Sequence, residues 1–173
     1  MTAQIANGGY KIKPKILTDD NELTSKQVKK AMQDSKKNNS YEPLYDDQRN
    51  IRIVQEAMFS STNEIMGTSY KSRIEDPKYQ FAGKTGTAQV KRISKREREL
   101  DLETFQIPYE ERDHALYVAY GPYSNPRYAV SIIVEHGGSG SSAAAPMATK
   151  LFKLIIDRHQ YRKKLPDYKE FSI

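Results

Sequence analysis

Residues 81–90, FAGKTGTAQV, bring an amine and two hydroxyl groups together on one short stretch of the chain. Lys84 supplies a positive charge, and the hydroxyls of Thr85 and Thr87 can donate hydrogen bonds to an anion. Gly86 has no side chain, so a second backbone can come close at this position. These residue types fit the binding of a phosphate or of a peptide carboxylate, and the two ligands require different surroundings.

A phosphate-binding loop ends in Gly-Lys-Ser/Thr, as Gly83, Lys84 and Thr85 do, and it also requires a glycine at position 78. That position is Lys78, and the TAQV that follows has the character of a strand rather than of a helix. The nucleotide-binding alternative is kept, although the residues satisfy only the end of its pattern.

A strand at the edge of a sheet is the second interpretation of the same stretch. A peptide backbone can add to such an edge as an extra strand, while the ammonium of Lys84 and the two threonine hydroxyls hold its terminal carboxylate. This interpretation requires the neighbouring chain to build a sheet.

Composition limits the class of protein. A chain of 173 residues, 37% of them hydrophobic, is a normal size for one domain with a core. It has no cysteine, which excludes a disulfide framework and a thiolate metal site. His114, His136 and His159 lie too far apart in the sequence to have the spacing of metal ligands, so we expect no metal and no cofactor.

The net charge of +6 suits nucleic acid, an anionic membrane surface or an acidic polymer. The basic run at 91–98 turns acidic directly afterwards and contains no aromatic residue, so we expect no nucleic-acid binding. No apolar run is long enough to cross a membrane, and the first residues lack the pattern of a signal peptide. We therefore expect a soluble chain without a targeting segment of its own.

The beginning of the chain has the pattern of the last turns of a helix, ended by Gly8 and Gly9 and followed by a short strand at 10–16. Met1 falls inside this helix. We therefore expect Met1 to be an internal start or a chosen boundary.

Residues 18–50 are polar and have the pattern of a surface insertion, with a weak helix at 25–34. Asp46 or Asp47 can then cap the helix that follows. The apolar positions of that helix recur at helical spacing and are Ile51, Val54 and Met58.

In residues 115–120 and 128–134, almost every position is apolar or aromatic, so the side chains that would face either side of a strand are apolar. This pattern predicts strands that are buried on both faces. The short, turn-rich connection between them predicts an antiparallel hairpin. A helix should begin near Ala144, with Pro146 in its first turn. Its predicted buried face is Met147, Leu151, Leu154 and Ile155.

These elements predict an α/β protein of the α+β type, with an antiparallel sheet of at least three strands and helices packed on it. Two amphipathic helices are few for a sheet that is apolar on both faces. At about 25 cal/mol per Å² of apolar surface, a few hundred Å² left in water would cost several kcal/mol. We therefore expect part of a larger domain, or a chain that takes its cover from a partner.

Several of these segments together resemble the C-terminal part of a class B penicillin-binding protein of the elongation type. They are TAQIANGGYKIKP, GTS at 67–69, FAGKTGTAQV, DHALYVAYGPYSNPRYAVSIIVEHGG and the last helix. The resemblance covers about 1–16 and 51–157, and the segments at about 18–50 and 91–112 correspond to variable insertions. It implies a partial penicillin-binding transpeptidase fold, which is β-lactamase-like.

Members of this family are peptidoglycan D,D-transpeptidases. They acylate a serine with the penultimate D-Ala of a stem peptide, release the terminal D-Ala and pass the acyl group to an amine of a neighbouring strand. The resemblance implies that Lys84 is the catalytic lysine of the Lys-Thr-Gly signature. It further implies that Thr85, Gly86 and Thr87 bind the donor carboxylate or a β-lactam, with the Thr87 amide as half of an oxyanion hole.

The resemblance also implies partners and a location. The partners are the stem peptide, β-lactams, the upstream part of the transpeptidase domain and an elongation-complex glycosyltransferase. The parent protein would work at the periplasmic face of the bacterial inner membrane.

The family's nucleophile stands in Ser-x-x-Lys, and no serine of this chain has a lysine in that position. Ser61, Thr62 and Asn63 fit the second signature, Ser-x-Asn, but stand much nearer Lys84 than the family pattern requires, so we interpret them as a coincidence. We expect the isolated chain to be inactive, and to self-associate or be partly disordered. The alternatives are a noncatalytic peptide-carboxylate binding module and a module that completes a fold. His114 is expected to be a structural residue.

Overall fold

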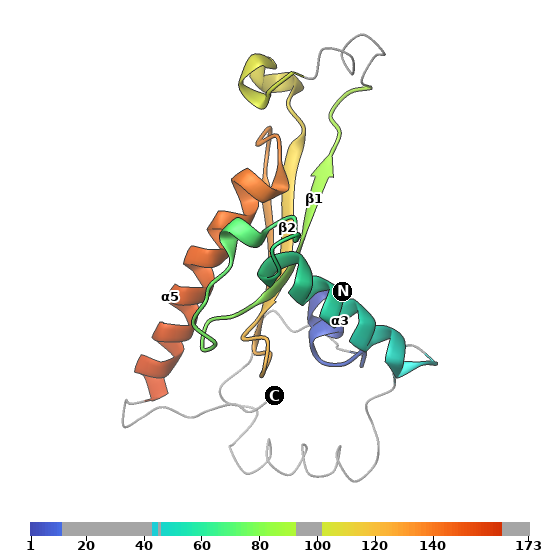
Figure 1. The fold of residues 1–173 in the computed structure, drawn as a ribbon, viewed down its shortest axis with the longest axis vertical. Helices are drawn as coiled ribbons and strands as arrows, with labels where there is room; N and C mark the ends of the chain where they lie inside the picture. The colour runs from blue at the N-terminus through green and yellow to red at the C-terminus, as the bar shows by residue number, and fades with distance from the viewer. Residues whose placement is uncertain (12–42, 45, 93–101, 164–173) are drawn as a thin grey trace, which may run out of the picture.

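The computed structural model contains an antiparallel sheet of three strands in the order β1-β2-β3, with helices packed on it (Figure 1). The strands are β1 (Ala82–Ala88), β2 (His114–Gly121) and β3 (Tyr128–Val134). This confirms the predicted α+β fold. The structure describes residues 1–11, 43–44, 46–92 and 102–163.

Strand β1 is an outer strand of this sheet, and its register with β2 runs from Ala82 opposite Tyr120 to Ala88 opposite His114. The Gly-Lys-Thr sequence therefore lies in the middle of a strand. Because no helix follows directly, its backbone amides cannot wrap a phosphate as a phosphate-binding loop does. This arrangement favours the strand-edge interpretation.

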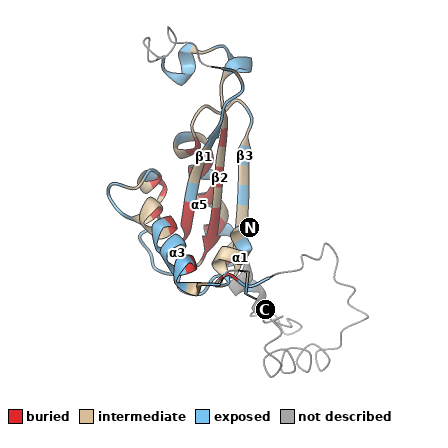
Figure 2. Cartoon of the chain, turned by 90° about the vertical axis from the view of Figure 1, so that its right-hand side faces the viewer, coloured by how far each residue is buried: buried red, intermediate tan, exposed pale blue. Residues whose placement is uncertain are grey.

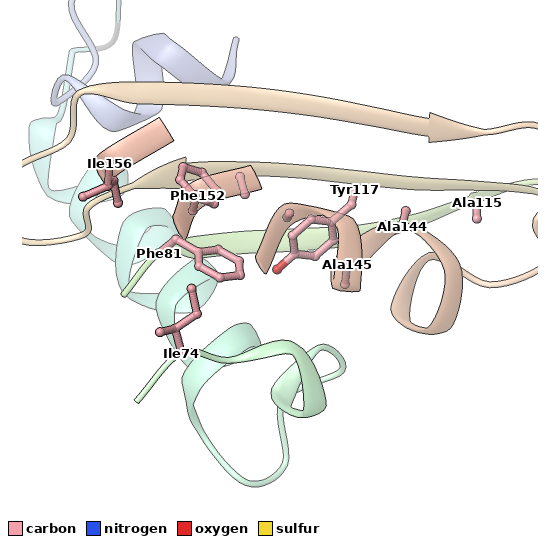
Figure 3. Close-up of a cluster of buried hydrophobic side chains, with 10 residues drawn as sticks. Ile74, Phe81, Ala115, Tyr117, Ala144, Ala145, Phe152 and Ile156 are labelled. Atoms are coloured by element: carbon pink, nitrogen blue, oxygen red, sulfur yellow. The ribbon is translucent and has the colours of Figure 1, made fainter. Parts of the chain in front are cut away.

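The main core lies between the sheet and helix α5 (Ala145–Lys163), which follows a π-helical turn, η4 (Gly140–Ala144). The rings of Phe81 and Phe152 stack with centroids 4.8 Å apart, and Tyr117 meets Phe81 edge-on (Figure 3). All three side chains are fully buried. These aromatic rings hold α5 to β1 and β2.

The predicted buried face of α5 is wrong. Met147 and Leu154 are 49% and 66% exposed, and the side chains that pack against the sheet come from another face of the helix. The buried residues of α5 are Ala145, Ala148, Phe152 and Ile156. Small alanine side chains let the helix approach the aromatic rings of the sheet closely, which larger side chains at the same positions would prevent.

Helix α3 (Gln48–Asn63) packs against the other side of β1, and the short helix α1 (Thr2–Ala6) lies over β2 and β3 (Figure 2). The side chain of Asp47 caps α3 by accepting a hydrogen bond from the Arg49 amide at 2.9 Å. Asp47 is one of the two residues that the sequence predicted as the cap. The second buried cluster consists of Met58, Ala82 and Tyr120, with Ile5, Ala6, Phe59, Val118 and Tyr123 around it.

The prediction that both strands of the hairpin are buried on both faces is wrong for β3. Its residues alternate between half-buried and exposed (Figure 2). The Ile133 side chain is 62% exposed. Helix α5 covers one face, while α1 is too short to cover the other along its whole length. In the part of the chain that the structure describes, the expected shortage of cover is therefore present.

The remaining connections are short 3-10 helices, η1 (Tyr70–Ser72), η2 (Thr104–Gln106) and η3 (Tyr109–Glu111). Gly8 and Gly9 follow α1, as the sequence predicted for the end of this helix, and the structure gives both of them positive φ angles. Helix α3 begins at Gln48, inside the predicted insertion at 18–50. The weak helix predicted at 25–34 lies outside the described residues, as do most of the strand predicted at 10–16 and most of the basic run at 91–98.

Candidate functional site

The four predicted site residues lie on the outer strand β1, and the structure divides them between its two sides. Side chains alternate along a strand, so Lys84 faces one side with Val118, its partner on β2. Thr85 pairs with Tyr117 and faces the other side, as does Thr87. The cation and the two hydroxyls therefore flank the strand instead of forming a single row.

Lys84 is exposed, and its ammonium donates a hydrogen bond to the backbone oxygen of Thr85 at 2.8 Å. The side chain also lines a groove of about 590 Å³ between α1, α3 and the sheet. Most of the other residues that line this groove are apolar, and they include Ile5, Val54, Met58, Met66 and Val118. The lysine is thus a cation at the border of an apolar groove.

Thr85 is half-buried, and its hydroxyl lies 3.2 Å from the hydroxyl of Thr68. The Thr68 hydroxyl is in turn 3.2 Å from the hydroxyl of Ser61, in the last turn of α3. The sequence did not reveal this row. The resemblance includes the turn at 67–69 without giving it a chemical role, and the match of residues 61–63 to Ser-x-Asn gives Ser61 none.

A second, buried group of hydroxyls lies beneath this row. The Tyr117 hydroxyl is 2.9 Å from the hydroxyl of Thr62 and 3.1 Å from the hydroxyl of Ser69. These two hydrogen bonds join β2 to the end of α3 and to the turn that follows α3. Burial raises the pKa of the Tyr117 phenol, so the hydroxyl stays protonated. Gly83 lies under this ring, and a Cβ there would overlap the phenol.

Two further polar residues hold strands of the sheet in place, one at the start of β1 and one opposite its end. The side-chain amide of Asn63 donates to the backbone oxygen of Phe81 at 3.0 Å, which fixes the start of the strand to α3. At the other end, Nδ1 of His114 accepts a hydrogen bond from the His136 amide at 2.9 Å. His114 therefore holds β2 to the turn that follows β3, which agrees with the structural role expected for it.

Residues 1–153 match the family described as Penicillin binding protein transpeptidase domain. The chain belongs to this penicillin-binding family. The transpeptidase relative MrdA from Haemophilus influenzae, a peptidoglycan D,D-transpeptidase, is 35% identical over 67% of this chain. The chain spans 16% of the length of that relative. These matches confirm the resemblance to elongation-type, class B penicillin-binding proteins.

Solved structures of penicillin-binding proteins share the fold of this chain. PBP2 of Pseudomonas aeruginosa in complex with WCK 5153 is 30% identical, with a TM-score of 0.58, and the match covers 88% of this chain and 28% of that one. PBP2 of Helicobacter pylori in complex with MreC has a TM-score of 0.56 at 24% identity, and that match covers 94% of this chain and 24% of the other. The latter likeness shows the fold alone.

None of the described helices combines the length and the apolar composition needed to cross a membrane. Within the described residues, no three His, Asp or Glu side chains gather closely enough to hold a metal ion.

Proposed function

We propose that this chain is the carboxylate-binding part of a peptidoglycan D,D-transpeptidase, and that β1 binds the D-Ala end of a stem peptide or a β-lactam. The observation that carries this proposal is the position of Lys84, Thr85, Gly86 and Thr87 on an outer strand of the sheet. A peptide backbone can add to such a strand, with its terminal carboxylate beside the ammonium and the hydroxyls.

Each residue has a proposed role. Lys84 acts as the catalytic lysine, whose charge attracts the carboxylate and adjusts the position of protons near the nucleophile. Thr85 and Thr87 donate hydrogen bonds to the carboxylate, and the Thr87 amide forms half of an oxyanion hole. Gly86 keeps this part of the strand open to the peptide backbone.

The nucleophilic serine is proposed to lie in a part of the transpeptidase that this sequence does not include. The apolar groove beside Lys84 is a suitable place for that part, because it has apolar walls and borders the catalytic lysine. The sheet face that leaves Ile133 exposed would gain its cover in the same way. The parent enzyme would act at the periplasmic face of the inner membrane, with an elongation-complex glycosyltransferase as a partner.

Substitution of Lys84 by alanine is expected to weaken the binding of N-acetyl-D-Ala-D-Ala about tenfold, because a charged hydrogen-bond donor to the carboxylate is lost. Binding would be measured by NMR titration, from the amide shifts of Gly86 and Thr87. Lys153→Ala removes an exposed lysine from α5 and should bind as the unsubstituted chain does. Equal binding by Lys84→Ala and the unsubstituted chain would contradict the proposed role of the lysine.

A fluorescent penicillin is expected to leave the 173-residue chain unlabelled on a denaturing gel, because no Ser-x-x-Lys is present to form the acyl-enzyme. An intact penicillin-binding protein labelled in the same gel serves as the control. A labelled band from this chain would show that it carries a nucleophile of its own, and the proposed division of the active site would have to be abandoned.

Two alternatives from other classes remain. A noncatalytic binding module would bind the peptide carboxylate and never gain activity. A module that only completes a fold would copurify with the upstream part of the domain, and the pair would gain penicillin labelling. The exposed apolar residues of this chain favour the second alternative over the first.

A further inference from the structure

The turn at 67–69 lies against the end of α3 in a way that fixes the position of Thr68. The amide and the hydroxyl of Ser69 both donate to the backbone oxygen of Ser61, each at 3.0 Å. Gly67 lies so close to the carbonyl groups of Ser60 and Ser61 that any side chain there would overlap backbone atoms. The backbone on both sides of Thr68 is therefore held to the helix.

Thr68 itself is exposed, although the residues on both sides of it pack against the end of α3. Its hydroxyl bridges the Ser61 hydroxyl and the Thr85 hydroxyl, at 3.2 Å from each. Each of the three hydroxyls has one hydrogen to donate, while each oxygen can also accept. In the absence of a ligand, either oxygen of each pair can be the donor.

A carboxylate beside Thr85 removes this freedom, because a carboxylate can only accept hydrogen bonds. Thr85 must then donate to the carboxylate, so Thr68 donates to Thr85 and Ser61 donates to Thr68. Hydrogen bonds in such a row polarise one another and strengthen by about 10–30% per bond. The row thereby aligns the Thr85 proton with the anion.

We propose that Thr68 is a positioning residue, which, supported by Ser61, holds the Thr85 hydroxyl as a donor to the terminal carboxylate of the peptide. This role rests on the proposed function of β1. It concerns the turn between α3 and β1, which contributes no residue to the Lys-Thr-Gly signature.

The test compares Thr68→Val with Thr68→Ser in the 173-residue chain. Valine keeps the shape of threonine without its hydroxyl, whereas serine keeps the hydroxyl. We expect Thr68→Val to bind N-acetyl-D-Ala-D-Ala about fivefold more weakly, since the neutral hydrogen bond that orients the Thr85 hydroxyl is lost. Thr68→Ser should restore binding, which a purely structural role of the methyl group would not predict.

A second measurement does not depend on the peptide. The three-bond couplings of Thr85 report its χ1 rotamer, and we expect a single rotamer in the unsubstituted chain and in Thr68→Ser. Thr68→Val should average between rotamers, because the partner of the hydroxyl is gone. Since Thr68 is exposed, the circular dichroism spectrum of all variants should stay unchanged.

The outcomes separate this inference from the proposed function. If Thr85→Val weakens binding and Thr68→Val does not, the positioning role is wrong and the carboxylate site stands. If Thr85→Val binds as the unsubstituted chain does, Thr85 does not contact the carboxylate and the positioning role falls with it. If the unsubstituted chain does not bind the peptide at all, both the proposed site and the role of Thr68 are overturned.

Discussion

Replacement of Phe152 by alanine is expected to lower the free energy of unfolding by about 3–5 kcal/mol, the usual cost of removing a large buried aromatic side chain. Phe152 is fully buried and stacks on Phe81 with a centroid distance of 4.8 Å. Its ring also fills the space above Gly121, where a Cβ would lie only 3.1 Å from it. The substitution leaves a cavity between α5 and the sheet.

Leu154→Ala on the same helix is the matched control. Leu154 is 66% exposed, so its substitution should change the free energy of unfolding by less than about 0.5 kcal/mol. Urea-induced unfolding followed by circular dichroism gives both values. Equal losses for the two variants would show that the structure assigns the wrong face of α5 to the core.

Replacement of Gly140 by alanine is expected to cost about 1–3 kcal/mol, because the added methyl group overfills a tightly packed site. A Cβ at this position would lie 2.5 Å from the Leu116 carbonyl oxygen and 2.6 Å from that of Gly86. Both contacts are to backbone atoms of the sheet, which cannot turn aside as a side chain can. The π-helical turn must therefore move away from β1.

This substitution also tests the link between η4 and the proposed site. The NMR shift of the Gly86 amide should change, and the binding of N-acetyl-D-Ala-D-Ala should weaken together with the stability. Ser142→Ala changes an exposed residue of the same turn and should leave both unchanged. An alanine at position 140 with no effect on stability would mean that the turn does not pack on β1 as the structure shows.

The sheet could be predicted from sequence because its signals are local. Two apolar runs and the short, turn-rich connection between them predicted β2, β3 and their hairpin, and a cap at Asp46 or Asp47 predicted the start of α3. The buried face of α5 could not be predicted in the same way. That helix carries apolar residues on two faces, one with the larger side chains that the sequence favoured and one with Ala145 and Ala148. The second face is buried because its small side chains fit against the aromatic rings of the sheet.

In the candidate site, too, the local features could be predicted from the sequence and the contacts made by tertiary packing could not. The type and order of Lys84, Thr85 and Thr87 are local, so the sequence predicted them as one group. The contact between Thr68 and Thr85 depends on how a turn folds back on a helix, and no spacing rule predicts it. The position of Ser61 near β1 could not be predicted either, because it results from the packing of α3 on the sheet.

The outer position of β1 has a consequence for the size of the ligand. The Lys84 ammonium bends back to the Thr85 backbone oxygen, so a single carboxylate, even that of acetate, can lie beside both the ammonium and the threonines. Acetate has no amide groups to pair with the backbone of the strand, whereas an extended peptide carries them along its whole length. Selectivity for extended peptides over simple acids would then arise from main-chain pairing along the margin of a single strand.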